Sequence, residues 1–138
     1  MDNNDTLTNR TEKRRMLVAD DDPAILRLIA TILEKENYNV VTARDGREAY
    51  KVLQTDPDFT AAILDVVMPY ISGPELVRYM KSEERLRSIP VMMMTAEQDP
   101  KLSSESFDAG ACVFLPKPFT TAQLQIMLQM LIGSKTAE

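Results

Sequence analysis

The chain has 138 residues, 44% hydrophobic and 27% charged, which is typical of a single soluble globular domain that folds without a disulfide or a structural metal. Its formal net charge of −5 argues against nucleic-acid binding by this domain, because such binding depends on Lys and Arg neutralising phosphates. The absence of histidine excludes His-ligated zinc and Ser–His or Cys–His catalytic pairs, so any metal must have oxygen ligands, which favours Mg²⁺ or Ca²⁺.

The sequence shows no signal for secretion or membrane insertion. No apolar run approaches the roughly 18 residues of a membrane span, and the polar N-terminus lacks a signal-peptide core. The single cysteine, Cys112, cannot form an internal disulfide. We therefore expect a cytoplasmic protein without membrane contact, in which residues 15–133 form one folded domain between a disordered tail (1–14) and a short C-terminal tail (134–138).

Short apolar runs alternate with amphipathic stretches along the rest of the chain. In chain order the pattern predicts a strand at 16–19, a helix from 23 to about 37, a strand at 39–43, a helix through 49–53, a strand at 61–64, a helix through 76–80, a strand at 91–94, a helix at about 100–109, a strand at 112–115 and a helix at about 120–132. Asp22 and Pro23 predict the N-cap and first residue of the first helix, Asp45-Gly46 predicts a turn, and Gly110 follows the end of the fourth helix.

Strands that alternate with helices predict a parallel sheet with helices on both faces and right-handed crossovers. Five strands fit the flavodoxin-like order 2-1-3-4-5, which forms a three-layer α/β/α sandwich. In that order the switch point, where such sheets bind ligands beyond the carboxyl ends of their strands, lies between the first and third strands.

Acidic residues follow the two strands that flank this switch point. The first strand ends in Asp20-Asp21 and the third in Asp65, so three carboxylates are expected to converge. Like charges held close together are costly unless a cation neutralises them. An octahedral Mg²⁺ that keeps several waters is the best match for such a set of oxygen ligands.

A hydroxyl and an ammonium are expected at the same edge, because Thr95 closes the fourth strand and Lys117 follows the fifth. An aspartate can attack a phosphoryl group to form an aspartyl phosphate, and Mg²⁺, Lys117 and Thr95 can stabilise the charge on its oxygens. Each residue alone has a simpler explanation, such as helix capping for Asp20 and Asp21 or a turn at Asp65. The prediction therefore depends on all of them lying at one edge of one sheet.

Four motifs, "LVADDD", "AAILDVVMP", "MMMTAE" and "FLPKPF", occur in an order and at a spacing that resemble the receiver domain of bacterial two-component response regulators. The resemblance covers about residues 15–132. It implies that Asp65 is the phosphoacceptor and that a sensor histidine kinase or phosphotransfer protein is the donor. It also implies a Mg²⁺ ion held by Asp20, Asp21, Asp65 and the backbone carbonyl of Val67.

The same resemblance implies a switch. By this resemblance we expect Thr95 to be the hydroxyl that moves toward the phosphate and Phe114 to be the aromatic residue coupled to it. We expect Lys117 to be the invariant cation, joined to Pro118 by a cis peptide bond. In this family, phosphorylation remodels the face formed by the fourth helix, fifth strand and fifth helix. The implied role is a regulatory domain that catalyses its own loading and unloading and controls a downstream protein or output domain, without an external substrate.

The acidic cluster leaves two alternatives to a receiver domain. A Mg²⁺-dependent phosphatase or phosphotransferase of the haloacid dehalogenase type would have a second Asp two residues after the nucleophile, where this chain has Val67. A pseudo-receiver that only binds proteins would lack the acceptor, the acidic pair or the lysine, and all are present. The family's common Met-Pro-x-x-Asp-Gly reads Met-Pro-Tyr-Ile-Ser-Gly here, and Ser72 can still form a turn.

Two helices have features of their own. The fourth helix is rich in serine and poor in apolar residues, so we expect it to be marginal and mobile, unless Leu102 and Phe107 hold it. On the fifth helix, Ile126 and Met130 point away from the buried stripe, which predicts a partner or homodimer contact on the switch face unless they are two isolated exposed side chains. The last expected helix is followed only by a short tail, which fits either a stand-alone receiver or one excised from a longer protein.

Overall fold

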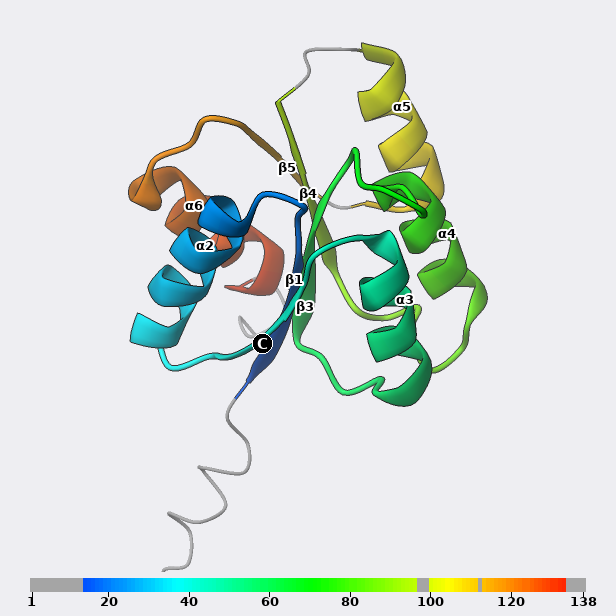
Figure 1. The fold of residues 1–138 in the computed structure, drawn as a ribbon, viewed down its shortest axis with the longest axis horizontal. Coiled ribbons are helices and arrows are strands. Elements are labelled where there is room, and N and C mark those ends of the chain that lie inside the picture. The colour runs from blue at the N-terminus through cyan, green and yellow to red at the C-terminus, as the bar shows by residue number, and fades with distance from the viewer. Residues whose placement is uncertain (1–13, 97–99, 112, 134–138) are drawn as a thin grey trace, which may run out of the picture.

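Five parallel strands form one sheet in the order β2-β1-β3-β4-β5 in the computed structural model, which describes residues 14–96, 100–111 and 113–133 (Figure 1). The strands are β1 (Arg15–Ala19), β2 (Asn39–Ala43), β3 (Ala61–Asp65), β4 (Val91–Thr95) and β5 (Val113–Pro116). Every adjacent pair is parallel. The flavodoxin-like order predicted from the sequence is confirmed, and β1 and β3 lie side by side at its switch point.

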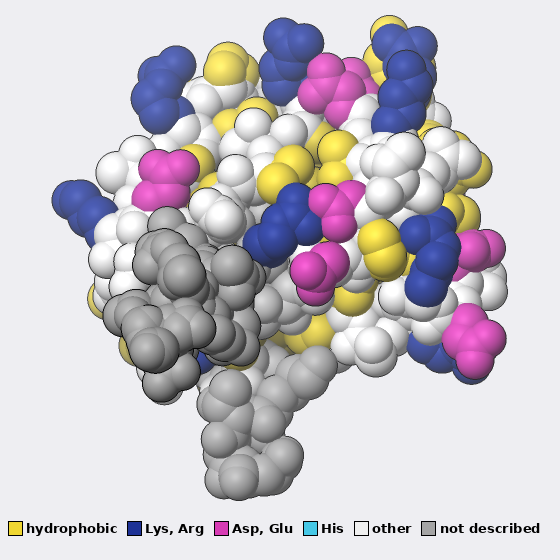
Figure 2. Space-filling view, turned by 90° about the horizontal axis from the view of Figure 1, so that it is seen from below, with side chains coloured by type: hydrophobic (Ala, Val, Ile, Leu, Met, Phe, Trp, Pro, Cys, Tyr) yellow, Lys and Arg dark blue, Asp and Glu magenta, His cyan; other side chains and the backbone are white. Residues whose placement is uncertain are grey.

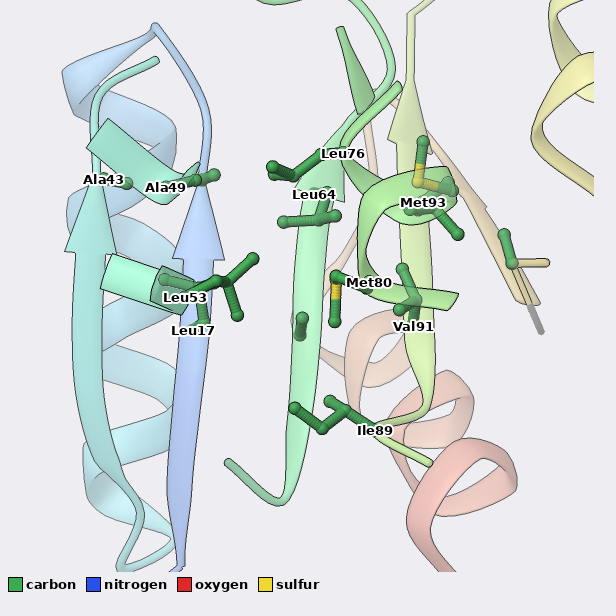
Figure 3. Close-up of a cluster of buried hydrophobic side chains, with 14 of the residues drawn as sticks. Leu17, Ala43, Ala49, Leu53, Leu64, Leu76, Met80, Ile89, Val91 and Met93 are labelled. Atoms are coloured by element: carbon green, nitrogen blue, oxygen red, sulfur yellow. The ribbon is translucent and has the colours of Figure 1, made fainter. Parts of the chain in front are cut away.

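Helices cover both faces of the sheet (Figure 1). One face carries α2 (Pro23–Lys35) and α6 (Thr121–Leu128), and the other carries α3 (Gly46–Thr55), α4 (Gly73–Ser82) and α5 (Pro100–Ala109). Buried side chains of the strands alternate between the two sides. Leu17, Leu64 and Met93 point toward α3 and α4 (Figure 3), whereas their neighbours along the strands pack under α2 and α6. This double burial explains why β3 and β4 are buried at every position.

Side chains cap the starts of four helices. The expected N-cap Asp22 accepts a hydrogen bond from the N–H of Ala24, with Pro23 at the first helical position. Asp45, expected in a turn, is the N-cap of α3. Ser72, also expected in a turn, caps α4 in a reciprocal pair with Glu75, the capping box that its Ser-x-x-Glu spacing favours.

The last helix differs from the expected regular helix ending at 132. The α-helical part of α6 ends at Leu128 and continues as a π-helical turn, η1 (Gln129–Gly133). Leu131 and Ile132 of this turn are both buried. A regular α-helix would place Leu124, Leu128, Leu131 and Ile132 on one face as well, so their spacing gives no signal for the π-helical turn.

At the edge of the sheet where the strands begin, side chains of both charge signs are interspersed (Figure 2). There Arg15 forms an ion pair with Asp56 at 2.6 Å and lies 4.6 Å from the centre of the Phe59 ring. Within the described ranges, no helix combines the length and apolar character needed to cross a bilayer. Of the expected tails (1–14 and 134–138), residues 1–13 and 134–138 lie outside the described residues, as does Cys112.

Candidate functional site

Three carboxylates gather at the carboxyl ends of β1 and β3. One oxygen from each of Asp20, Asp21 and Asp65 lies within 4.8 Å of the others. Asp20 has no exposed surface, Asp65 is 7% exposed, and Asp21 faces solvent. The cluster therefore has a buried floor and an open side, at the switch point where the sequence placed it.

Asp20 is held from two directions. One carboxylate oxygen accepts a hydrogen bond from the N–H of Asp22 at 2.9 Å, and the other accepts one from Nζ of Lys117 at 2.6 Å. Its own N–H donates to the carbonyl of Ala43 at the end of β2, at 3.1 Å. Asp22 is occupied with capping α2, so the acidic cluster consists of the first two aspartates of the Asp-Asp-Asp run together with Asp65.

Lys117 enters the site from the loop after β5. Its backbone N–H donates to the carbonyl of Thr95 at 2.8 Å, the peptide bond to Pro118 is cis as expected, and Nζ lies 3.4 Å from Oδ2 of Asp65. Burial by itself would lower the pKa of Lys117, but the hydrogen bond to Asp20 and the charges of Asp65 and Asp20 outweigh it and raise that pKa. Lys117 is therefore an ammonium at neutral pH.

Burial, reinforced by the charge of Asp20 and opposed by Lys117, raises the pKa of Asp65 to about 6. A raised carboxyl pKa means that the ionised form lacks sufficient countercharge. A divalent cation would supply it, and the cluster offers only oxygen ligands at a spacing that an octahedral ion and its waters can bridge. The residues present therefore fit Mg²⁺.

The other residues singled out in the sequence lie at the same edge, within β5, or on α6 and η1. Thr95 is buried at the end of β4, next to β3, and Val67, in the loop after Asp65, is 57% exposed. Phe114 of β5 is partly buried, with its ring centre 4.8 Å from that of Phe107 on α5. The expected exposure of Ile126 and Met130 is confirmed, at 60% and 58%.

Two features of the site went unpredicted. The short ion pair between Lys117 and Asp20 has no sequence signal, because the motifs place Lys117 beside the acidic cluster without choosing its partner. The second is a stack of Arg47 on Tyr70 at the tip of the loop after Asp65. Tyr70 adopts a positive φ of 73° without the Gly or Asn that usually marks such a position.

Known proteins share both the fold and the motifs of this chain. The family model described as "Response regulator receiver domain" matches residues 16–129. "Response regulator MprA" of Mycolicibacterium vanbaalenii is 35% identical over 125 residues, which are 90% of this chain and 52% of that protein. "DNA-binding dual master transcriptional regulator RpaA" of a Synechocystis species is 34% identical over 86% of this chain and 48% of that protein. The chain thus spans about half the length of these relatives.

Solved structures agree with this assignment. Chemotaxis response regulator CheY4 of Vibrio cholerae superposes with a TM-score of 0.80 at 33% identity, over 86% of this chain and 98% of that one. The receiver domain of sensor histidine kinase PA1611 from Pseudomonas aeruginosa, described with a magnesium ion coordinated in its active site cleft, has a TM-score of 0.79 at 28% identity, over 87% and 98% of the two chains. The chain therefore belongs to the response regulator receiver domain family, the regulatory phosphoacceptor domains of two-component signalling systems.

Proposed function

We propose that this chain is a phosphorylation switch in which Asp65 accepts a phosphoryl group while Mg²⁺ is bound beside it. The observation that carries the proposal is the convergence of three carboxylates at the switch point, with the Lys117 ammonium 3.4 Å from Asp65. Asp20, Asp21, Asp65 and the backbone carbonyl of Val67 are the proposed protein ligands. In this proposal residues 15–133 form the receiver domain, and the flanking segments are tails.

The proposed transfer is a substitution at phosphorus. An oxygen of ionised Asp65 forms the new O–P bond as the bond from phosphorus to the donor breaks, and the leaving group takes the electron pair and then a proton. Because the chain has no histidine of its own, the donor is a phosphohistidine of a sensor kinase or phosphotransfer protein, and the leaving group is its imidazole.

Three groups stabilise the transferred phosphoryl group in this proposal. Mg²⁺ held by the acidic cluster would neutralise charge on the phosphoryl oxygens and on the three carboxylates. Lys117 adds a positive charge that is held within reach of Asp65 by its own hydrogen bonds. The Thr95 hydroxyl, at the end of the adjacent strand, donates a hydrogen bond to a phosphoryl oxygen. The same site catalyses hydrolysis of the aspartyl phosphate by water, which resets the switch.

Movement of Thr95 toward the phosphoryl group is the proposed start of the signal. Phe114 responds from the neighbouring strand, and its contact with Phe107 carries the change into α5. Physically this is a two-state element biased by one added charged group. The α5–β5–α6 face then controls a downstream protein or an output domain, and this domain makes no nucleic-acid contact itself.

The outer side of α6 and of the η1 turn that continues it is the proposed contact surface on that face. Ile126 of α6 and Met130 of η1 border the same open hollow of about 440 Å³. Residues 121–133 contain no charged side chain, in a chain that is 27% charged. An uncharged, exposed apolar stripe favours contact with a protein partner, including a second copy of this chain.

Beryllofluoride, a mimic of the phosphoryl group, tests the proposal without a kinase. Fluorine NMR of the protein with beryllofluoride and Mg²⁺ should show a bound signal that disappears when EDTA is added. The control variant Asp65→Asn should show none. A bound signal that persists in Asp65→Asn, or its absence from the wild-type protein, would reject Asp65 as the acceptor.

A further inference from the structure

The loop between β3 and α4 is closed at its base beside the acidic cluster. The N–H of Gly73 donates to the carbonyl of Val66 at 2.9 Å, and the N–H of Val66 donates to Met94 on β4 at 2.8 Å. The loop begins immediately after Asp65, and its second residue is Val67. The shape of this loop therefore determines where the Val67 carbonyl points.

The tip of the loop is a strained turn centred on Tyr70. The N–H of Ile71 donates to the carbonyl of Pro69 at 2.8 Å, across Tyr70 at φ 73°. This is a γ-turn with a positive φ, which is rare and unfavourable for a large side chain with a Cβ atom. Such a conformation persists only where the surroundings hold it, and it is found most often at functional sites.

Helix α3 supplies the groups that hold this turn. The N–H of Gly46 donates to the carbonyl of Pro69 at 3.2 Å, and a Cβ at Gly46 would lie 1.9 Å from the carbonyl oxygen of Ile71. The next residue, Arg47, places its guanidinium 3.9 Å from the centre of the Tyr70 ring. Tyr70 is 67% exposed, so burial does not hold the ring, and the cation–π contact takes that role.

We propose that Arg47 and Tyr70 form a clamp that holds the loop after Asp65 in the shape required for Mg²⁺ binding through the Val67 carbonyl. They are positioning residues, and the inference rests on the proposed function. Between Val67 and Tyr70 lie only a buried Met68 and Pro69, whose ring fixes φ. Few torsions are therefore available to absorb a change at Tyr70 before it reaches Val67.

The sign of the effect on Mg²⁺ affinity separates the clamp from simple electrostatics. Removing a positive charge near a cation site should strengthen Mg²⁺ binding, whereas releasing the clamp should weaken it. Arg44→Ala is the matched control, because Arg44 is exposed, lies three residues earlier and pairs with Glu48 rather than with the loop. Arg47→Lys keeps a cation above the ring and serves as the rescue variant.

The experiment is a Mg²⁺ titration of the full chain, in which amide NMR and calorimetry measure binding. Arg47→Ala should lower the affinity about two- to fivefold, the range a surface cation–π contact supplies, and should shift the Val67 amide resonance in the metal-free protein. Arg47→Lys should restore most of the affinity, and Arg44→Ala should leave it equal or higher. If the wild-type protein binds Mg²⁺ and Arg47→Ala binds it equally well or better, the clamp is wrong. If the wild-type protein does not bind Mg²⁺, the proposed function itself fails.

Discussion

Nζ of Lys117 lies 2.6 Å from Oδ2 of Asp20, a carboxylate with no exposed surface, and 3.4 Å from Oδ2 of Asp65. The sequence led us to expect Lys117 beside the phosphoryl position at Asp65, but its closer partner is Asp20. Because Asp20 is also a proposed metal ligand, the ammonium and Mg²⁺ draw on the same buried carboxylate. We therefore expect Lys117 to oppose Mg²⁺ binding while it assists phosphoryl binding.

Replacing Lys117 should separate these two effects. In Lys117→Met, the cluster keeps its three carboxylates and loses its only ion-paired ammonium among the described residues, so Mg²⁺ affinity should rise about tenfold, equivalent to about 1.4 kcal/mol. Loading by a small phosphodonor should be lost. The metal-free variant should also be less stable, because Asp20 is left buried without its partner. A fall in Mg²⁺ affinity, measured by titration calorimetry, would contradict this account.

Asp65 should make the metal-free protein less stable at neutral pH than in weak acid. Its pKa, raised to about 6, exceeds that of the unfolded chain, so the folded state binds the proton more tightly. The contribution of Asp65 to the free energy of unfolding therefore falls as pH rises from about 4 to 6 and stays low above that range. In EDTA at pH 7, Asp65→Asn should be more stable than the wild-type protein by about 3 kcal/mol, since each unit of the pKa difference is worth about 1.4 kcal/mol.

Denaturant unfolding at two pH values checks this prediction. The advantage of Asp65→Asn should shrink toward zero near pH 4, where the wild-type carboxyl is protonated, and should also shrink in saturating Mg²⁺. If Asp65→Asn is equal to or less stable than the wild-type protein at pH 7 in EDTA, the ionised Asp65 carboxylate does not destabilise the folded state and the prediction is wrong.

Helix α5 should be the least protected helix against amide exchange. It contains three serines in ten residues, and Phe107 is 53% exposed although it contacts Phe114. Amides of α5 should exchange at least about tenfold faster than those of α2, as expected of a locally unstable segment. Ser104→Ala, at an exposed position, should slow exchange in α5 modestly by raising helix propensity. Protection in α5 equal to that of α2 would refute the expectation of a mobile helix.

Much of the fold could be predicted because both faces of the sheet are covered. Strands such as β4 are then apolar at every position but the last, here the buried Thr95. Strand order alone then brings the carboxyl ends of β1 and β3, and hence Asp20 and Asp65, to one crevice. The apolar pattern of the strands and their order are therefore sufficient to predict this part of the site.

The features that the sequence did not predict depend on how segments distant in the chain pack against one another. The choice of Asp20 as the closer partner of Lys117 is a matter of distances that no motif encodes. The positive φ of Tyr70 occurs where Gly46, 24 residues earlier in the sequence, approaches the loop closely, and no local sequence pattern indicates that approach. The π-helical turn after Leu128 has no signal in the sequence, because the spacing of Leu131 and Ile132 also fits a regular helix.

Substitutions on α6 should test its proposed contact surface. The double variant Ile126→Gln and Met130→Gln should keep its stability, because both side chains are more than half exposed, and should lose self-association or partner binding. Leu28→Gln on α2 is the matched control, since Leu28 is 44% exposed on another helix. Sedimentation with and without beryllofluoride, and a pull-down in both states, provide the readout. Unchanged association and unchanged partner binding would remove α6 as a contact surface.

The most direct test of the account is the intact mass of the protein after incubation with acetyl phosphate. With Mg²⁺ the wild-type protein should gain the mass of one phosphoryl group, and peptide mapping should locate it on Asp65. Neither the wild-type protein in EDTA nor Asp65→Asn in Mg²⁺ should gain that mass. A phosphoryl group on Asp65→Asn, or an unmodified wild-type protein in Mg²⁺, would contradict the account.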